Sequence, residues 1–340
     1  MDKEYIKALA EKLFSIDSPS GYTGNAIAFL EQEAQSLGYA AFRNEKGNLH
    51  IMVNGCDESR TVGISAHTDT LGLMVRSINA DGTLAITALG GPIMPTLDGE
   101  YCRIITRDQK VYTGTILSSS PAVHVYADAK SKARDCDNML VRIDEVVKNK
   151  EDVKALGIMN GDIIAYDPKT VITPSGFVKS RFLDDKISVV CLFGVLKMMR
   201  EQKITPKHRC IFIITTYEEV GHGASSLPAL NELIACDMGC IGLDLACSEY
   251  DVSICAKDSG GPYDYAMTSK LIELAKREKL NFAVDIYPYY GSDVGAGLRG
   301  GNDIKGALIG PGVHASHGME RTHMQALDAT MKLILAYITE

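Results

Sequence analysis

Acidic and imidazole side chains follow several of the apolar runs in this 340-residue sequence. The run "TVGISAH" ends at His67 with Asp69 two positions on, and "RCIFIITTY" leads into Glu218 and Glu219. A third run, "GCIGLDLA", contains Asp244. Ligands of open α/β sheets bind beyond the carboxyl ends of the strands, so we expect these side chains at one edge of a sheet.

Imidazole and carboxylate groups together suit a divalent metal, with Zn²⁺ or Co²⁺ preferred over Mn²⁺. Two metals that share a bridging carboxylate would make a hydrolytic site. Successive side chains of an extended segment point in opposite directions. One of the adjacent glutamates could therefore bind metal while the other accepts a proton from water. Asp184 and Asp185 begin a buried helix in "RFLDDKISVV", and "PGVHASHGMERTH" supplies three histidines after another apolar run.

Each feature also has a simpler explanation. A histidine at a strand end is more often a hydrogen-bonded structural residue, and two adjacent glutamates are commonly a solvated loop. The "LDDK" segment could be a helix cap, and Asp293 in "GSDVGAG" either borders the pocket or is a turn residue. Asp244 is harder to explain in this way because an unpaired aspartate is costly to bury. The metal hypothesis rests on the order and shared placement of the features.

Composition excludes several classes of protein. The chain is 46% hydrophobic and 23% charged with a net charge of −8 and no long basic run, so neither nucleic acid nor a membrane is expected as a partner. The first residues form an amphipathic helical pattern rather than a signal peptide, and no apolar stretch is long enough to span a bilayer. Nine cysteines without a CxxC pair indicate a reducing compartment, and we expect a cytoplasmic protein.

The elements that would position these groups alternate between helix and strand at both ends of the chain. Between them, short strand-like runs separated by Gly, Pro and Asp turns predict a small antiparallel barrel or sandwich. We therefore expect an α/β domain with a mixed sheet, formed by residues 1–71 and 176–340, interrupted by an all-β domain at 72–175. The strand that carries Asp244 is expected at 239–246.

The motifs in this order resemble family forty-two of the metallopeptidases, the glutamyl or deblocking aminopeptidases that form tetrahedral (TET) particles, whose catalytic domain is zinc-peptidase-like. The resemblance extends over nearly the whole chain: "SPSG" near the start, "AHTD" at 66–69, "LGG" at 89–91, "LGIMNGD" at 156–162, "LDDK" at 183–186, "EEVG" at 218–221, "GLD" at 242–244 and "GSDVGAG" at 291–297. It implies oligomers from dimers up to dodecamers, with the inserted domain forming oligomer contacts and narrowing access to the site.

The resemblance also implies a role for each matched residue. His67 binds one of two divalent metal ions, and the carboxylate of Asp69 orients its imidazole. Asp184 bridges the metals, Glu218 is the general base, and Glu219 is a metal ligand. Asp244 and a C-terminal histidine complete the coordination. Counting back from the last helix favours His317 for that histidine, with His323 as the alternative.

These roles predict an aminopeptidase that removes N-terminal residues from short peptides with a metal-activated water. Thr70, Tyr217 and His222 differ from the residues usual in the family, which leaves open an amidase or deacylase acting on a specialised peptide-like amide. A glycosidase is a further alternative, but it needs two carboxylates on opposite sides of a sugar. A non-catalytic binding protein with a degenerate site is the last.

Overall fold

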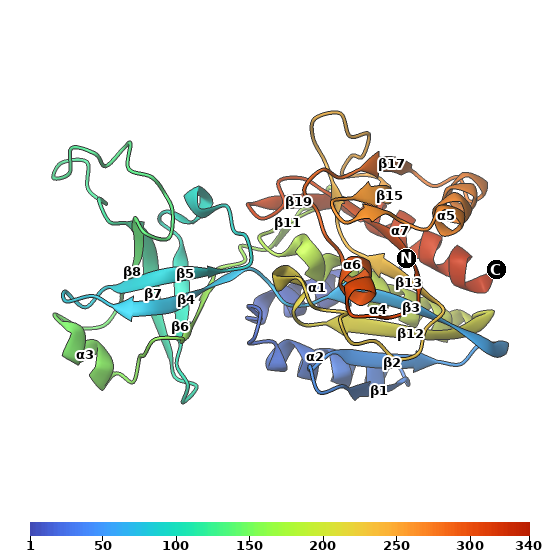
Figure 1. Cartoon of the computed structure of the whole chain (residues 1–340), viewed down its shortest axis with the longest axis horizontal. Coiled ribbons are helices and arrows are strands. Elements are labelled where there is room, and N and C mark those ends of the chain that lie inside the picture. Colours follow the sequence, from blue (N-terminus) through green and yellow to red (C-terminus); the bar gives the residue numbers. More distant parts are fainter. The chain divides into compact units, whose positions relative to one another are not determined.

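A ten-stranded mixed sheet forms the centre of the larger of two units into which the chain divides (Figure 1). The computed structural model describes residues 1–340, with Met1–Thr70 and Lys169–Glu340 in the larger unit and Leu71–Pro168 in the smaller one. The insert therefore ends earlier than the expected 175. The reason is local, because β10 (Val171–Ile172) already pairs with β11 (Phe177–Ser180) of the larger unit.

Four central strands of this sheet run parallel. The strand order is β1 (Ala40–Arg43), β2 (Leu49–Val53), β12 (His208–Thr215), β3 (Asp57–His67), β13 (Glu232–Cys236), β18 (Lys305–Val313), β15 (Val252–Asp258) and β16 (Gly261–Pro262), with β14 (Gly239–Cys240) beside β18 and β17 (Phe282–Ile286) beside β15. Parallel strands are covered on both faces, which explains the nearly continuous apolar runs of β3, β12 and β18.

Helix α4 (Leu183–Gln202) is buried along most of its length and begins at the candidate site. It packs on β3 and against two further helices, α1 (Lys3–Ser15) and α7 (Met324–Thr339). The remaining helices of this unit cover other strands: α2 (Gly24–Ser36) lies on β1 and β2, α5 (Tyr265–Arg277) on β15, and α6 (Asp293–Arg299) on β13 and β18.

The smaller unit is a closed barrel, as the sequence predicts. Its strands close in the order β4 (Gly72–Ile78), β5 (Leu84–Leu89), β8 (Met139–Ile143), β7 (Val111–Ser118), β6 (Tyr101–Ile105) and β9 (Ile163–Tyr166), accompanied by the 3₁₀ turn η1 (Met94–Leu97) and the helix α3 (Lys150–Ala155). Buried side chains such as Leu73, Val75, Ile86, Ile104 and Val141 form its core.

The larger unit also contains a small three-stranded sheet in which β11 joins β10 to β19 (Glu320–His323). None of the chain's helices combines the length and the apolar character needed to pass through a bilayer.

One predicted strand is wrong. Residues 239–246 do not form a strand, because only Gly239 and Cys240 pair with β18 and the chain then enters turns. The strand that belongs to the central parallel set is β13, which ends at Cys236 and is followed directly by Asp237.

Strand β18 packs closely against the backbone of Asp237 at Gly310. A Cβ atom on Gly310 of β18 would lie 1.8 Å from the carbonyl oxygen of Asp237. We therefore expect Gly310→Ala to lower the free energy of unfolding by at least about 1–3 kcal/mol, the usual cost of overpacking, in urea titrations. Gly24→Ala is the matched control, because a Cβ atom added at Gly24 would have no neighbour within 4 Å. Wild-type stability of the Gly310 variant would contradict this packing.

Candidate metal centre

The register of the parallel strands brings three strand ends to the same level. Thr215, the last residue of β12, pairs with His67, the last residue of β3. Ala235 of β13 pairs with Ser65 of β3, which places the residue after β13, Asp237, level with His67. Parallel strands present their carboxyl ends at one edge, as expected for ligand sites of α/β sheets.

Asp69 fixes the two glutamates through their backbone. Its carboxylate accepts hydrogen bonds from the amides of Glu218 (3.1 Å) and Glu219 (3.3 Å), which begin the 3₁₀ turn η2 (Glu218–Val220), and from the hydroxyl of Ser20 (2.5 Å). The oxygen nearest to His67 Nδ1 is the backbone carbonyl of Asp69, at 2.9 Å, whereas the carboxylate is 3.5 Å away. This geometry differs from the expected one, in which the carboxylate orients the imidazole.

The same contact determines the tautomer of His67. A carbonyl oxygen can only accept a hydrogen bond, so Nδ1 donates, and Nε2 is the nitrogen that can bind a ligand once it has lost its own proton. His67 Nε2 points to Asp184 Oδ1 at 3.1 Å and lies 3.7 Å from Glu218 Oε2.

Asp184 stands between two imidazoles. Its second oxygen, Oδ2, lies 3.3 Å from Nε2 of His317, which is also 3.6 Å from Glu219 Oε2. A carboxylate with one oxygen toward each histidine has the geometry of a bridging ligand. Of the two candidate histidines, His317 is therefore the one at the site. His323 is instead the N-cap of α7, where Nδ1 accepts from the amide of Gln325.

Asp244 does not join this cluster, contrary to the sequence prediction. It lies in an exposed turn beside Leu243, whose exposed fraction is 98%. Asp237 is buried and lines the site in its place. The segment "ELIACD" carries the same signal as the other strand ends, an apolar run followed by an acid, but the adjacent "GCIGLDLA" presents it too.

A second carboxylate that sequence reasoning did not identify is Glu320. It is buried in β19, and its two oxygens accept from the amides of Asp184 and His317, both at 3.0 Å. The sequence around Glu320 gives no sign of its burial, because "ERTH" at 320–323 has the pattern of an ordinary exposed strand.

The donor set fits divalent cations. Ligand atoms of His67, Asp184 and Glu219 lie within 4.8 Å of one another, and the same holds for His67, Asp185 and Asp237. Glu219 Oε1 and Asp185 Oδ1 are buried without a hydrogen-bond partner. Because an unpaired buried carboxylate oxygen is costly, these atoms point to a cation as their partner.

Without a cation, the buried carboxylates favour protons. Burial raises the pKa of Glu218 and Glu219 well above the ordinary value; neighbouring carboxylates raise it further, and the imidazole of His67 offsets only part of the rise. Burial and then the charge of Asp184 raise the pKa of Asp237 to about 7. A metal ion would reverse this tendency because it favours the charged form.

Asp184 and His67 behave in the opposite way. Burial would raise the pKa of Asp184, but its hydrogen bonds with His317 and His67 outweigh that effect and lower the pKa. Burial lowers the pKa of His67, but its contacts with Asp184 and Asp69 raise it well above the usual range. The pair is therefore held as an ion pair when no metal is bound.

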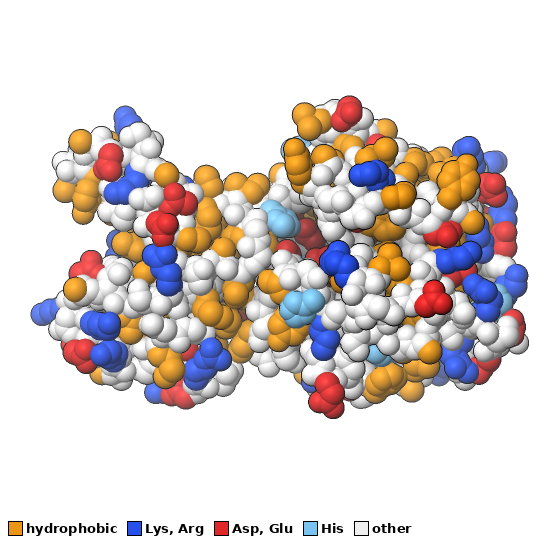
Figure 2. All heavy atoms as spheres, viewed as in Figure 1, with side chains coloured by type: hydrophobic (Ala, Val, Ile, Leu, Met, Phe, Trp, Pro, Cys, Tyr) orange, Lys and Arg blue, Asp and Glu red, His pale blue; other side chains and the backbone are white.

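The cluster opens into a cavity of about 260 Å³. Figure 2 shows acidic side chains at the bottom of a hollow on the larger unit, with a histidine and a basic side chain beside them. Arg299 is the cation in the lining, and Nη2 donates to the carbonyl of Gly221 at 3.3 Å. The residues that line the cavity are Asp184, Glu218, Glu219, Gly221, Asp237, Tyr289, Tyr290, Gly291, Ser292, Arg299 and His317.

A mixed α/β sheet that presents imidazoles and unpaired carboxylates at its carboxyl edge is the framework of a metal-dependent hydrolase. The comparisons narrow that class. The profile of the M42 glutamyl aminopeptidase family matches residues 47–333, so the chain belongs to this family. It is accordingly an aminopeptidase, a metal-dependent exopeptidase.

Individual relatives agree with this assignment. The chain is 44% identical over 332 residues to YhfE of Bacillus subtilis (strain 168), provisionally named an aminopeptidase, and the match covers 97% of this chain and 96% of the other. The fold is similar to that of a TET aminopeptidase from a Thaumarchaeota archaeon, with a TM-score of 0.90 and 17% identity; the match covers 100% of this chain and 97% of the other. It is also similar to that of PhTET1, described as a dodecamer (TM-score 0.86, 22% identity, covering 98% and 99%).

The assignment of Asp237, in place of Asp244, as a metal ligand can be tested directly. We expect Asp237→Asn to lose a large part of the bound metal, because an amide cannot supply the anionic charge. Asp244→Asn should keep the wild-type content, since the side chain is exposed in a turn. Elemental analysis of the two purified variants measures both. The reverse pattern would restore the original assignment of Asp244.

The raised pKa of Asp237 gives a pH dependence for the metal-free protein. The folded state holds this proton up to a pKa of about 7, whereas an unfolded aspartate releases it near about 3.9. The stabilisation is therefore complete below the lower value and is lost as pH rises through the higher one. In chelator, the melting temperature should fall less between pH 4.5 and 7.5 for Asp237→Asn than for the wild type. Parallel pH profiles would contradict this.

Proposed function

We propose that this chain hydrolyses N-terminal residues from short peptides with Glu218 as the general base. The two divalent ions would be held by His67, Asp184, Glu219, Asp237 and His317. The observation that carries this proposal is the position of Asp184, whose two oxygens lie 3.1 Å and 3.3 Å from the Nε2 atoms of two different histidines. Zn²⁺ or Co²⁺ suits this donor set best.

When bound, the ions would polarise the scissile carbonyl and make water acidic enough to attack it near neutral pH. Glu218 lines the cavity, and its amide donates a hydrogen bond to Asp69, which supports its assignment as the general base. It would accept the proton of the attacking water and return it to the leaving amine.

The acidic lining supports an exopeptidase over an endopeptidase. A free α-ammonium group would be attracted by the carboxylates of Asp237 and Glu219, which line the same cavity. An acylated amino terminus carries no such charge. A specialised peptide-like amide with a free amine would be recognised by the same groups, so a substrate panel must include both kinds.

The proposed chemistry predicts a sharp separation of turnover from metal binding. Glu218→Gln should lower kcat by about 10²–10⁴-fold, the usual contribution of a general base, while metal content stays at the wild-type level. Glu201→Gln, an exposed change at the end of α4, is the matched control. Aminoacyl-p-nitroanilides provide the assay, with N-acetylated versions expected to be inert.

Chelation and metal add-back complete this test. Activity should vanish in chelator and return with Zn²⁺, Co²⁺ or Mn²⁺, and the best ion identifies the preferred metal. Hydrolysis that survives complete metal removal would refute the proposal. Ordinary turnover by Glu218→Gln would refute only the assignment of the base.

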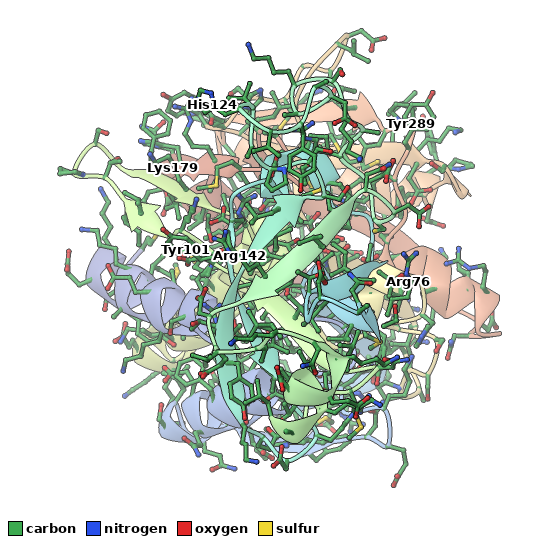
Figure 3. The ribbon with its side chains drawn as sticks, turned by 90° about the vertical axis from the view of Figure 1, so that its left-hand side faces the viewer. Arg76, Tyr101, His124, Arg142, Lys179 and Tyr289 are labelled. Atoms are coloured by element: carbon green, nitrogen blue, oxygen red, sulfur yellow. The ribbon has the colours of Figure 1, made fainter.

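The proposal includes self-assembly through the inserted barrel and a cytoplasmic location. The barrel exposes large apolar side chains, among them Tyr101 (70% exposed), Val125 (75%) and Val146 (91%). Figure 3 labels Tyr101 on β6 and Arg142 on β8, two strands of the barrel. These side chains are available for contacts between copies of the chain, and PhTET1 is described as a dodecamer. All nine cysteines are free thiols, which supports a reducing compartment.

A further inference from the structure

Glu320 joins two parts of the candidate site that come from distant segments. Oε2 accepts a hydrogen bond from the amide of Asp184, and Oε1 accepts from the amide of His317, both at 3.0 Å. The side chain is 1% exposed and is absent from the cavity lining, and both of its oxygens have backbone partners. Glu320 is therefore placed to hold other residues rather than to touch a ligand.

The residues that it holds are the two whose side chains meet. Asp184 Oδ2 lies 3.3 Å from His317 Nε2. Asp184 precedes the regular part of α4, where its backbone is not helical. His317 lies in a turn and has a φ of 62°, in the left-handed region that non-glycine residues seldom occupy. Neither backbone is fixed by a regular helix or strand at that point, so the spacing of the pair depends on other contacts.

A carboxylate is a costly choice in this environment. Seven other buried or partly buried carboxylates lie at or beside the site, and a further anion adds repulsion. They are Asp69, Asp184, Asp185, Glu218, Glu219, Asp237 and Asp293. A glutamine of the same shape would avoid the charge, but its amide nitrogen is a donor and cannot accept from a backbone N–H. A carboxylate offers one acceptor oxygen to each of the two amides, which accounts for an acid at this position.

We propose that Glu320 is a positioning residue that sets the separation of Asp184 and His317 and thereby the affinity of the metal that they share. This inference rests on the proposed function of the site as a metal centre. The pairing of β19 supports this role of Glu320. Glu320 pairs with Ser180 of β11, and β11 leads into α4 and Asp184. One short strand thus connects the segment before Asp184 with the segment after His317.

The test measures metal affinity, without turnover. Glu320→Gln should bind Zn²⁺ about 10- to 100-fold more weakly than the wild type, the usual effect of losing an outer-shell partner. Competition with a chromophoric chelator gives the affinity, and the Co²⁺ absorption spectrum should change in shape because the ligand geometry is altered. Glu232→Gln is the matched control. It loses contacts with Arg60 and Tyr337 at the opposite end of β13 and should keep the wild-type affinity and spectrum.

The experiment distinguishes a role of Glu320 in metal affinity from a purely structural role. A variant that is less stable without metal, yet has the wild-type Zn²⁺ affinity and Co²⁺ spectrum, would show a purely structural role and overturn the inference. If Glu320→Gln does not fold, Glu320→Asp keeps both acceptors but withdraws them by one methylene. It should weaken binding too, and unchanged affinity would likewise overturn the inference. A wild-type protein that binds no metal would refute the proposed function itself.

Discussion

The repulsion among buried carboxylates is the constraint on which this structure depends. Asp184, Asp185, Glu219 and Asp237 gather around His67. Two unit charges 4 Å apart repel by about 4 kcal/mol at an effective dielectric constant of 20. Such a cluster is tolerable only when positive charge neutralises it. In the metal-free chain that charge comes from protons and from the imidazoles, and a divalent ion must displace those protons when it binds. Metal affinity and pH are thus linked by the composition of the site.

The carboxylates near the site fall into two groups with different partners. Asp69, Asp293 and Glu320 each use both oxygens to accept protein N–H or O–H groups: Asp293, for example, accepts from the hydroxyl of Thr215 and the amide of Ala224. Glu219 and Asp185 each keep one buried oxygen without a partner. The first group holds the backbone around the strand ends, and the second is left for cations. Hydrogen-bond satisfaction therefore identifies the supporting acids in a way that residue type cannot, whereas the ligand roles proposed for Asp184 and Asp237 rest on their position in the cluster.

The sequence alone predicts the features that local patterns determine, and it misses those that depend on tertiary contacts. The α/β architecture and the barrel follow from apolar runs and turn residues, and His67, Asp184 and Glu219 stand out because each follows or begins an apolar element. The choice of His317 rests instead on the family resemblance, by counting back from the last helix. Asp237 was missed because two successive apolar runs each carry an aspartate, and only the pairing of β13 with β3 shows which one reaches the edge. Glu320 was missed because its burial arises from the pairing of β19 with β11, a tertiary contact that leaves no mark in "ERTH".

The chain crosses between the larger unit and the barrel at two points, and at each point backbone hydrogen bonds hold the chain within the larger unit. The chain leaves this unit after Thr70, the residue that follows Asp69, and returns at Lys169, ahead of Asp184. At the exit, Thr70 exchanges backbone hydrogen bonds with the "SPSG" segment, donating to Ser18 (2.9 Å) and accepting from Ser20 (3.1 Å). At the return, β10 and β11 pair with each other and then with β19. Both crossings are thus held by backbone hydrogen bonds within the larger unit, close in the sequence to the site residues Asp69 and Asp184. This gives "SPSG" a physical role that its position in the sequence does not reveal.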